Sequence, residues 1–187
     1  MLKKPVILLL LAFVLFGCEA RKPDKVTKEK GKKMEEIEVT SSAFAEGELI
    51  PAEYTADGRN ISPPIDWSPG PEGTKSFALI NDDPDTPMGT WVHWVIYNIP
   101  PDVTSLDDNI LPEETLPNGA IHGTTDFGRI GYGGPAPPSG THRYFFKIYA
   151  LDTKLDLTPG ATKRELEQAM AGHILAQGQL MGNYKRR

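Results

Sequence analysis

Two stretches of the sequence gather side chains that can hold a polar ligand or carry a proton. The acidic stretch 82–85 holds three aspartates and is followed by His93, while His142 and Tyr144 stand in the second stretch. Imidazole donates or accepts hydrogen bonds near neutral pH, and a phenol hydroxyl does both. A carboxylate accepts hydrogen bonds and can orient an imidazole ring. These residue types predict a small site in which histidine and tyrosine meet a phosphate or carboxylate oxygen.

The elements that must position these side chains are β-strands. Gly and Pro supply 18 and 17 of the 187 residues, which favours many turns and short strands. Apolar and aromatic runs between turn signals predict strands at 77–80, 91–99, 143–151 and 179–184. Both alternate sets of residues in 91–99 are apolar, so we expect that strand to be central and covered on both faces. The predicted fold is mainly β, an antiparallel β-sandwich with one or two short helices.

Alternation along a strand also orders the second stretch. His142 and Tyr144 are two residues apart and share one face with Phe146, so the tyrosine hydroxyl can lie beside the imidazole. Arg143 then points to the opposite face, and we do not assign it to the anion. The one convincing helix begins at Thr162, where Thr162-Lys163-Arg164-Glu165 has the pattern of a capping box.

Other interpretations of the same residues stay open at this point. The aspartates of 82–85 could be turn residues alone, and His93 could be a core histidine inside an apolar strand. His122 and His173 are expected to be structural or exposed. A metal site built from the aspartates and histidines is chemically possible, but the sequence contains no known ligand spacing such as His-Glu-x-x-His. We therefore expect no metal and no other cofactor.

The motifs around these residues resemble those of a known family. The sequence has Asp82-Asp83-Pro84-Asp85-Thr86-Pro87, then Gly89-Thr90-Trp91-Val92-His93-Trp94, and later the run from Gly131 to Tyr144. Together they resemble the two signature stretches of the phosphatidylethanolamine-binding proteins, also called Raf kinase inhibitor proteins, and in particular their bacterial branch. The resemblance extends upstream through 54–67 and spans nearly all of 40–187.

The resemblance implies a β-sandwich with a small anion-binding pocket at one end. The residues that match the family's pocket and are predicted to bind the ligand are Asp83, Asp85, Pro87, Trp91, His93, Gly134, Pro137, His142 and Tyr144. Ala136 departs from the pattern, since eukaryotic members tend to carry glycine there.

The two aspartates need roles of their own, because an acid does not attract an anion. We expect one of them to accept hydrogen bonds from N–H groups of its own turn, as aspartate does in tight turns. The other is expected to orient His93 or to meet the amine of a zwitterionic headgroup such as ethanolamine.

The N-terminus has the pattern of an export signal. Residues 1–4 carry two lysines, 6–16 form an unbroken apolar run too short to span a bilayer, and Leu15-Phe16-Gly17-Cys18 follows at once. This ending resembles the lipobox of bacterial lipoproteins, which implies a signal peptide at 1–17 and fatty acyl chains, such as palmitate, on Cys18. The alternative is an ordinary secretory signal in which Cys18 is incidental.

Charge separates the segment after Cys18 from the domain. Residues 19–36 carry seven basic and five acidic side chains and almost nothing apolar, which predicts a disordered tether over 18–36. The domain at 37–187 carries 11 basic and 20 acidic residues, a net charge of −9. Such an acidic domain is poorly suited to nucleic acid, which needs clustered cations.

The function expected from these observations is a membrane-anchored, non-enzymatic binding protein for a small anion or phospholipid headgroup. The anchor places the chain outside the cytoplasm on a bacterial membrane, with the outer membrane favoured where one exists because Glu19, not aspartate, follows Cys18. One alternative is an inhibitor or regulator of a protein target, in the manner of kinase- or protease-inhibiting family members. The other alternative is a weak hydrolase with a His/Asp dyad. Hydrolysis by a serine nucleophile has less support, because the sequence has no Gly-x-Ser-x-Gly motif.

Overall fold

The computed structural model describes residues 35–186, and the predicted signal peptide, Cys18 and most of the predicted tether lie outside the described residues. The described chain forms nine strands, one α-helix and one 3₁₀ turn. In order these are β1 (Glu35–Glu36), β2 (Val39–Thr40), η1 (Ala52–Tyr54), β3 (Ile65–Trp67), β4 (Ser76–Asp83), β5 (Trp91–Ile99), β6 (Ser105–Leu106), β7 (Ile121–His122), β8 (Thr141–Leu151), α1 (Lys163–Met170) and β9 (Ile174–Lys185). β1 begins two residues before the predicted domain boundary at 37.

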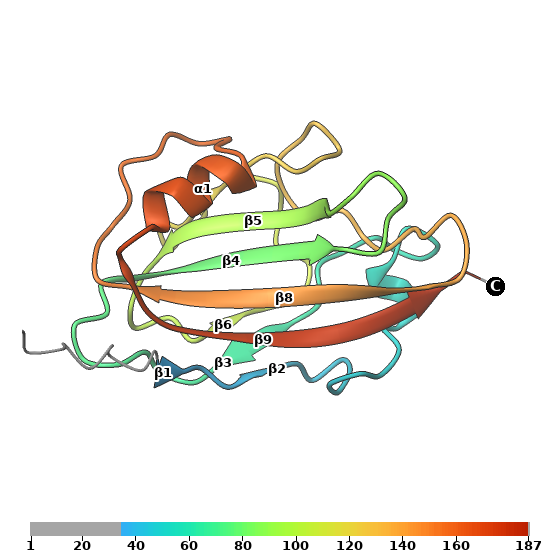
Figure 1. The fold of residues 1–187 in the computed structure, drawn as a ribbon, viewed down its shortest axis with the longest axis horizontal. Helices are drawn as coiled ribbons and strands as arrows, with labels where there is room; N and C mark the ends of the chain where they lie inside the picture. The colour runs from blue at the N-terminus through green and yellow to red at the C-terminus, as the bar shows by residue number, and fades with distance from the viewer. Residues whose placement is uncertain (1–34, 187) are drawn as a thin grey trace, which may run out of the picture. The chain divides into compact units, whose positions relative to one another are not determined.

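Two sheets make up the fold, as expected for a sandwich. The larger sheet has the strand order β1-β9-β8-β4-β5-β7, and the smaller one has the order β2-β3-β6. All pairs are antiparallel except β1 with β9. Figure 1 shows the long central strands of the larger sheet, with α1 packed beside β5 at its upper edge.

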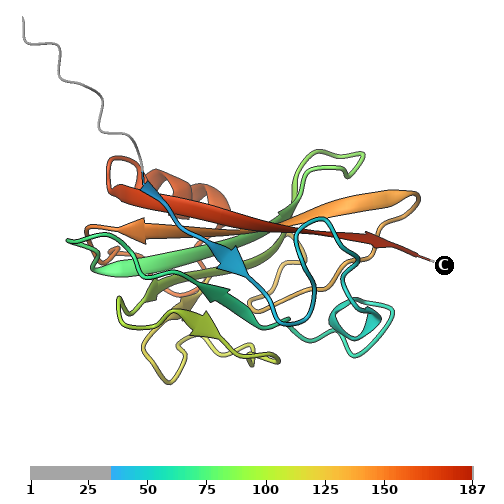
Figure 2. The same cartoon turned by 90° about the horizontal axis from the view of Figure 1, so that it is seen from below.

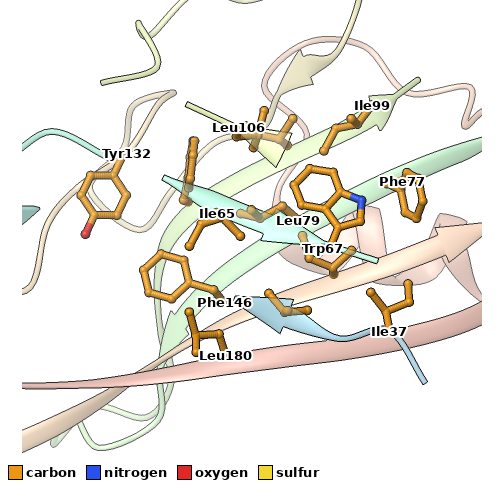
Figure 3. Close-up of a cluster of buried hydrophobic side chains, with 14 of the residues drawn as sticks. Ile37, Ile65, Trp67, Phe77, Leu79, Ile99, Leu106, Tyr132, Phe146 and Leu180 are labelled. Atoms are coloured by element: carbon orange, nitrogen blue, oxygen red, sulfur yellow. The ribbon is translucent and has the colours of Figure 1, made fainter. Parts of the chain in front are cut away.

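Residue alternation in β4 explains why the larger sheet is covered on both faces. Phe77 and Leu79 belong to a core shared with the smaller sheet, whereas Ala78 and Ile80 belong to a second core under α1. Figure 2 shows the smaller sheet on one side of the larger one, and Figure 3 shows the core between them. All eight residues of β4 are buried, which rigidifies the strand that carries the acidic stretch.

The helix begins as predicted. Thr162 is the N-cap, its hydroxyl accepts the Glu165 N–H, and the Glu165 carboxylate accepts the Thr162 N–H at 2.8 Å, which confirms the capping box. Lys163 of the first turn donates to the buried carboxylate of Asp82, which also accepts from Lys147 of β8 at 2.8 Å. Asp82 thereby joins β4, β8 and α1.

Two details of β4 and β5 differ from the prediction. Residues 81–83 are buried strand residues, whereas the predicted strand ends at Ile80. Lateral hydrogen bonds from β8 continue the strand through Asp82. In β5 the register skips one residue, because Asn81 pairs with Trp94 while Asp82 pairs with Val92. His93 is the extra residue of this bulge, so strict alternation along β5 fails there.

Candidate ligand-binding pocket

The two signature stretches meet at one end of the larger sheet, where β4 ends and β8 begins (Figure 1). A cavity of about 420 Å³ lies there. Its walls come from the end of β4, the loop 84–90, the start of β5, the turn 125–129, the loop 131–140 and β8. The lining residues are Asp83, Thr86, Pro87, Met88, Trp91, His93, Phe127, Ala136, Pro137, Pro138 and Tyr144.

Asp83 holds the polar floor of the cavity together. One carboxylate oxygen, Oδ1, accepts the Asp85 N–H at 2.8 Å, which is the turn bond expected of one aspartate. The other, Oδ2, accepts the Nδ1–H of His142 at 2.7 Å. Both side chains are buried, at 2% and 7% exposure. The aspartate therefore orients His142 and fixes the start of the 84–90 loop.

Asp85 faces Arg143 and does not line the cavity. Its carboxylate accepts hydrogen bonds from the Arg143 backbone N–H and Nε at 2.9 Å and from Nη2 at 2.6 Å. The guanidinium lowers the pKa of Asp85 below its ordinary value. Of the two roles expected for the second aspartate, orientation of His93 is wrong, because Arg143 of β8 occupies this carboxylate instead. Contact with the amine of a headgroup stays a prediction. Asp85 clamps the 84–90 loop to β8.

The bulge in β5 turns His93 into the cavity. Its Nδ1 lies 2.6 Å from the carbonyl oxygen of Gly133, and since a carbonyl only accepts, Nδ1 carries the proton. Burial lowers the pKa of His93, although the carbonyl and the neighbouring carboxylates Asp83, Asp82 and Asp126 oppose that shift. The ring is therefore neutral near pH 7, and Nε2 is free to accept a hydrogen bond.

Tyr144 supplies the unsatisfied group of the site. The residue is 1% exposed, lines the cavity, and packs edge-on against His93 with ring centroids 5.1 Å apart. Its hydroxyl makes no hydrogen bond of acceptable geometry within the described part of the chain, although the Asp83 side chain and the Ala136 backbone lie near it. Burial and the nearby Asp83 carboxylate raise the pKa of Tyr144, so the hydroxyl keeps its proton. A buried donor without a partner costs free energy, and a ligand acceptor would satisfy it.

Phe127 forms an outer wall that the sequence analysis missed. Its ring lies edge-on to Trp91 at 5.6 Å and to His93 at 5.3 Å, yet the side chain is 40% exposed. The signal was an aromatic residue in a polar turn, between Asp126 and Gly128, where a solvated loop needs none. Phe127 lies four residues before the second signature stretch and therefore outside the residues that carry the resemblance.

The predicted site residues divide into two groups. Six line the cavity, namely Asp83, Pro87, Trp91, His93, Pro137 and Tyr144. Three lie behind it: His142 and Asp85 through the contacts above, and Gly134 through its N–H, which donates to the Asn60 side chain at 2.7 Å. No cation belongs to the described lining, and within residues 35–186 no group of three potential metal ligands converges.

The two histidines expected to be structural or exposed lie outside this cavity. His122 is fully buried and accepts the indole N–H of Trp94 at 3.1 Å. His173 lies near the surface against Asp152, with Nδ1 2.7 Å from its carboxylate. Both placements agree with the expectation.

Comparison with known proteins identifies the family. Residues 40–185 match the sequence family described as phosphatidylethanolamine-binding protein. The chain belongs to this family. A UPF0098 protein of Methanothermobacter thermautotrophicus is 52% identical over 150 residues, which cover 80% of this chain and 99% of that one.

Solved structures of family members agree with the fold. A phosphatidylethanolamine-binding protein homologue from Chlamydia trachomatis has 41% identity and a TM-score of 0.75, covering 81% of this chain and 99% of that one. YbcL of E. coli, described as a member of the mammalian family, has 35% identity and the same TM-score and coverage. The expected fold class is therefore confirmed, as a phosphatidylethanolamine-binding protein-like fold with two sheets and one short helix.

Proposed function

We propose that this family member is a non-catalytic binding protein that holds a small anion, such as a phosphate or the phosphate of a phospholipid headgroup, in the cavity beside Tyr144. The observation that carries the proposal is the Tyr144 hydroxyl, a buried donor with no well-formed hydrogen bond within residues 35–186, on a side chain that lines a cavity of about 420 Å³. An oxygen of the ligand would accept that hydrogen bond.

The neutral state of His93 defines the second contact. Because Nδ1 donates to Gly133, only Nε2 can face a ligand, and near pH 7 it is an acceptor. An anion can meet it in two ways: the ring takes up a proton on binding, or the anion brings its own, as a protonated phosphate oxygen does. In both cases one proton lies between Nε2 and the ligand oxygen, and it offsets the charge of Asp83.

Titration calorimetry with inorganic phosphate and with phosphoethanolamine tests the proposal. We expect saturable binding of one ligand per chain that weakens about tenfold to hundredfold in Tyr144→Phe, since one hydrogen bond to a charged acceptor contributes about 1.5–3 kcal/mol. Tyr149→Phe is the matched control: Tyr149 lies on the same strand but belongs to the α1 side of the sheet. No binding by either ligand, or equal loss in both variants, refutes the proposal.

We further propose that the protein is exported and held on a membrane by acyl chains on Cys18. The support is the sequence pattern at 1–18, and two or more chains anchor a protein stably. No helix among the described residues is long and apolar enough to cross a bilayer. In cells labelled with a palmitate analogue, we expect label on the protein and its recovery with membranes, and both should be lost in Cys18→Ser. Label retained by that variant would exclude acylation at this residue.

A further inference from the structure

The cavity is larger and more apolar than a bare anion requires. Its volume of about 420 Å³ lies within the range of sites that hold drug-sized ligands, whereas an inorganic phosphate fills a small part of such a space. The buried polar groups are those of Asp83, His93 and Tyr144, and the remaining polar lining residue, Thr86, donates its hydroxyl to the Gly89 carbonyl. Toward the mouth the lining is apolar, with Trp91 and Phe127 on one side. A ligand that fills the cavity therefore carries an apolar group next to its polar end.

The Phe127 wall is fixed in place before any ligand arrives. The turn that carries it is closed by Thr125, whose N–H and hydroxyl both donate to the Arg129 carbonyl, at 3.0 and 2.7 Å. The Asp126 carboxylate accepts the Val92 N–H of β5 at 2.7 Å, which ties the turn to the sheet. These bonds preorganise the aromatic wall.

Gly133 admits the Phe127 ring to its position. A Cβ atom at residue 133 would lie 2.4 Å from Cε2 of that ring, far inside contact distance. The same glycine supplies the carbonyl that holds His93. One residue thus sets both the polar contact and the aromatic wall, with the two rings 5.3 Å apart.

The loop 84–90 also lines the cavity, and it too is held in place. The Asp85–Arg143 clamp fixes its start, and the Gly89 N–H donates to the Thr86 carbonyl at 3.1 Å. This loop presents Met88, which is 83% exposed although it lines the cavity. A flexible thioether adapts its shape to flat apolar surfaces and contacts aromatic rings favourably. Phe127 and Met88 therefore add an aromatic ring and a flexible thioether to the lining of one cavity, which suits a flat apolar group.

Resting on the proposed function, we propose that Phe127 and Met88 select among anions those attached to an aromatic or similarly flat apolar group. The anionic end lies at Tyr144 and Nε2 of His93, and the apolar group lies between the turn 125–129 and the loop 84–90. Since no cation lines the described cavity, burial of apolar surface supplies most of the affinity. The ligand class is an aryl-substituted phosphate or carboxylate.

Calorimetric titration with inorganic phosphate, phosphoethanolamine and phenyl phosphate separates the two proposals. We expect phenyl phosphate to bind about tenfold to hundredfold more tightly than the other two, the factor that burial of one aromatic group supplies. Phe127→Ala should remove that advantage, so that phenyl phosphate and inorganic phosphate bind this variant with similar affinities. Leu111→Ala is the matched control, because Leu111 is also an exposed apolar residue, 56% accessible, but does not line the cavity.

The three calorimetric titrations distinguish failure of the selectivity from failure of the anion site. Equal affinities of the wild-type protein for phosphate and phenyl phosphate, or a preference that survives in Phe127→Ala, overturn the selectivity while the proposed anion site stands. No binding of any of the three overturns the proposed function and this inference with it. A preference for phosphoethanolamine over phenyl phosphate would point to recognition of the amine and also refute the role of Phe127.

Discussion

Replacing Tyr144 with phenylalanine should make the unliganded protein more stable while it weakens ligand binding. The hydroxyl is buried and unpartnered, and such a group costs about 1–3 kcal/mol. Phenylalanine keeps the ring, its packing against His93 and its place in the core. We expect the free energy of unfolding to rise by about 1 kcal/mol, which for a domain of this size raises the Tm by about 2–4 °C. Chemical and thermal denaturation without ligand measure both quantities.

Tyr132→Phe provides a matched comparison with the opposite sign. Tyr132 is also buried, but its hydroxyl donates to the carbonyl of Tyr54 at 2.8 Å. Removing that donor leaves a buried carbonyl unpaired, so we expect a loss of about 1–2 kcal/mol. If Tyr144→Phe also lowers stability, the Tyr144 hydroxyl has a partner in the free protein, and the argument that the cavity awaits an acceptor fails.

Three other changes test separate parts of the site. Burial lowers the pKa of His93, and a bound anion raises it again, so the protein takes up a proton on binding when the pH lies between these two pKa values. The affinity for sulfate, which does not titrate, should therefore rise by up to about tenfold per pH unit as the pH falls through that window. In His93→Gln the affinity for sulfate should change little with pH. Asp82→Asn removes the charge that two partly exposed lysines contact, and urea denaturation should show that the free energy of unfolding falls by about 2–3 kcal/mol. The affinity for the ligand should change little. A decrease in the free energy of unfolding no larger than that of ordinary surface substitutions would contradict a stabilising role of this buried ion cluster. Gly133→Ala should displace the Phe127 ring and lower the affinity for phenyl phosphate more than that for inorganic phosphate, whereas equal effects on both would show that the ring does not touch the ligand.

Local patterns in the sequence predicted the elements of the fold well. Strands at 77–80, 91–99, 143–151 and 179–184 correspond to β4, β5, β8 and β9, and the capping box at 162–165 begins α1. These features depend on side-chain alternation and on contacts between near neighbours. The resemblance to the family also predicted which stretches of the chain meet, and six of the predicted site residues line one cavity.

The features that the sequence could not predict depend on contacts between distant strands. The bulge at His93 exists because β5 has one residue more than β4 between two paired positions, and a register shift leaves no local signal. The Asp85–Arg143 clamp and the Phe127 wall likewise join residues far apart in the chain. Alternation alone would place His93 with Val95, in the core under α1.

Two adjacent aspartates show how the strand divides structural from ligand-binding roles. Asp82 and Asp83 are both buried in β4, and because successive side chains point to opposite faces, one carboxylate faces α1 and the other faces the cavity. The Asp82 carboxylate contacts the ammonium groups of two lysines, whose positive charges balance its negative charge. Asp83 meets only His142 and a backbone N–H, so its charge remains to act on His93 and Tyr144. An anion that enters with a proton relieves that charge, which is why the cavity should favour a protonated ligand over a fully ionised one.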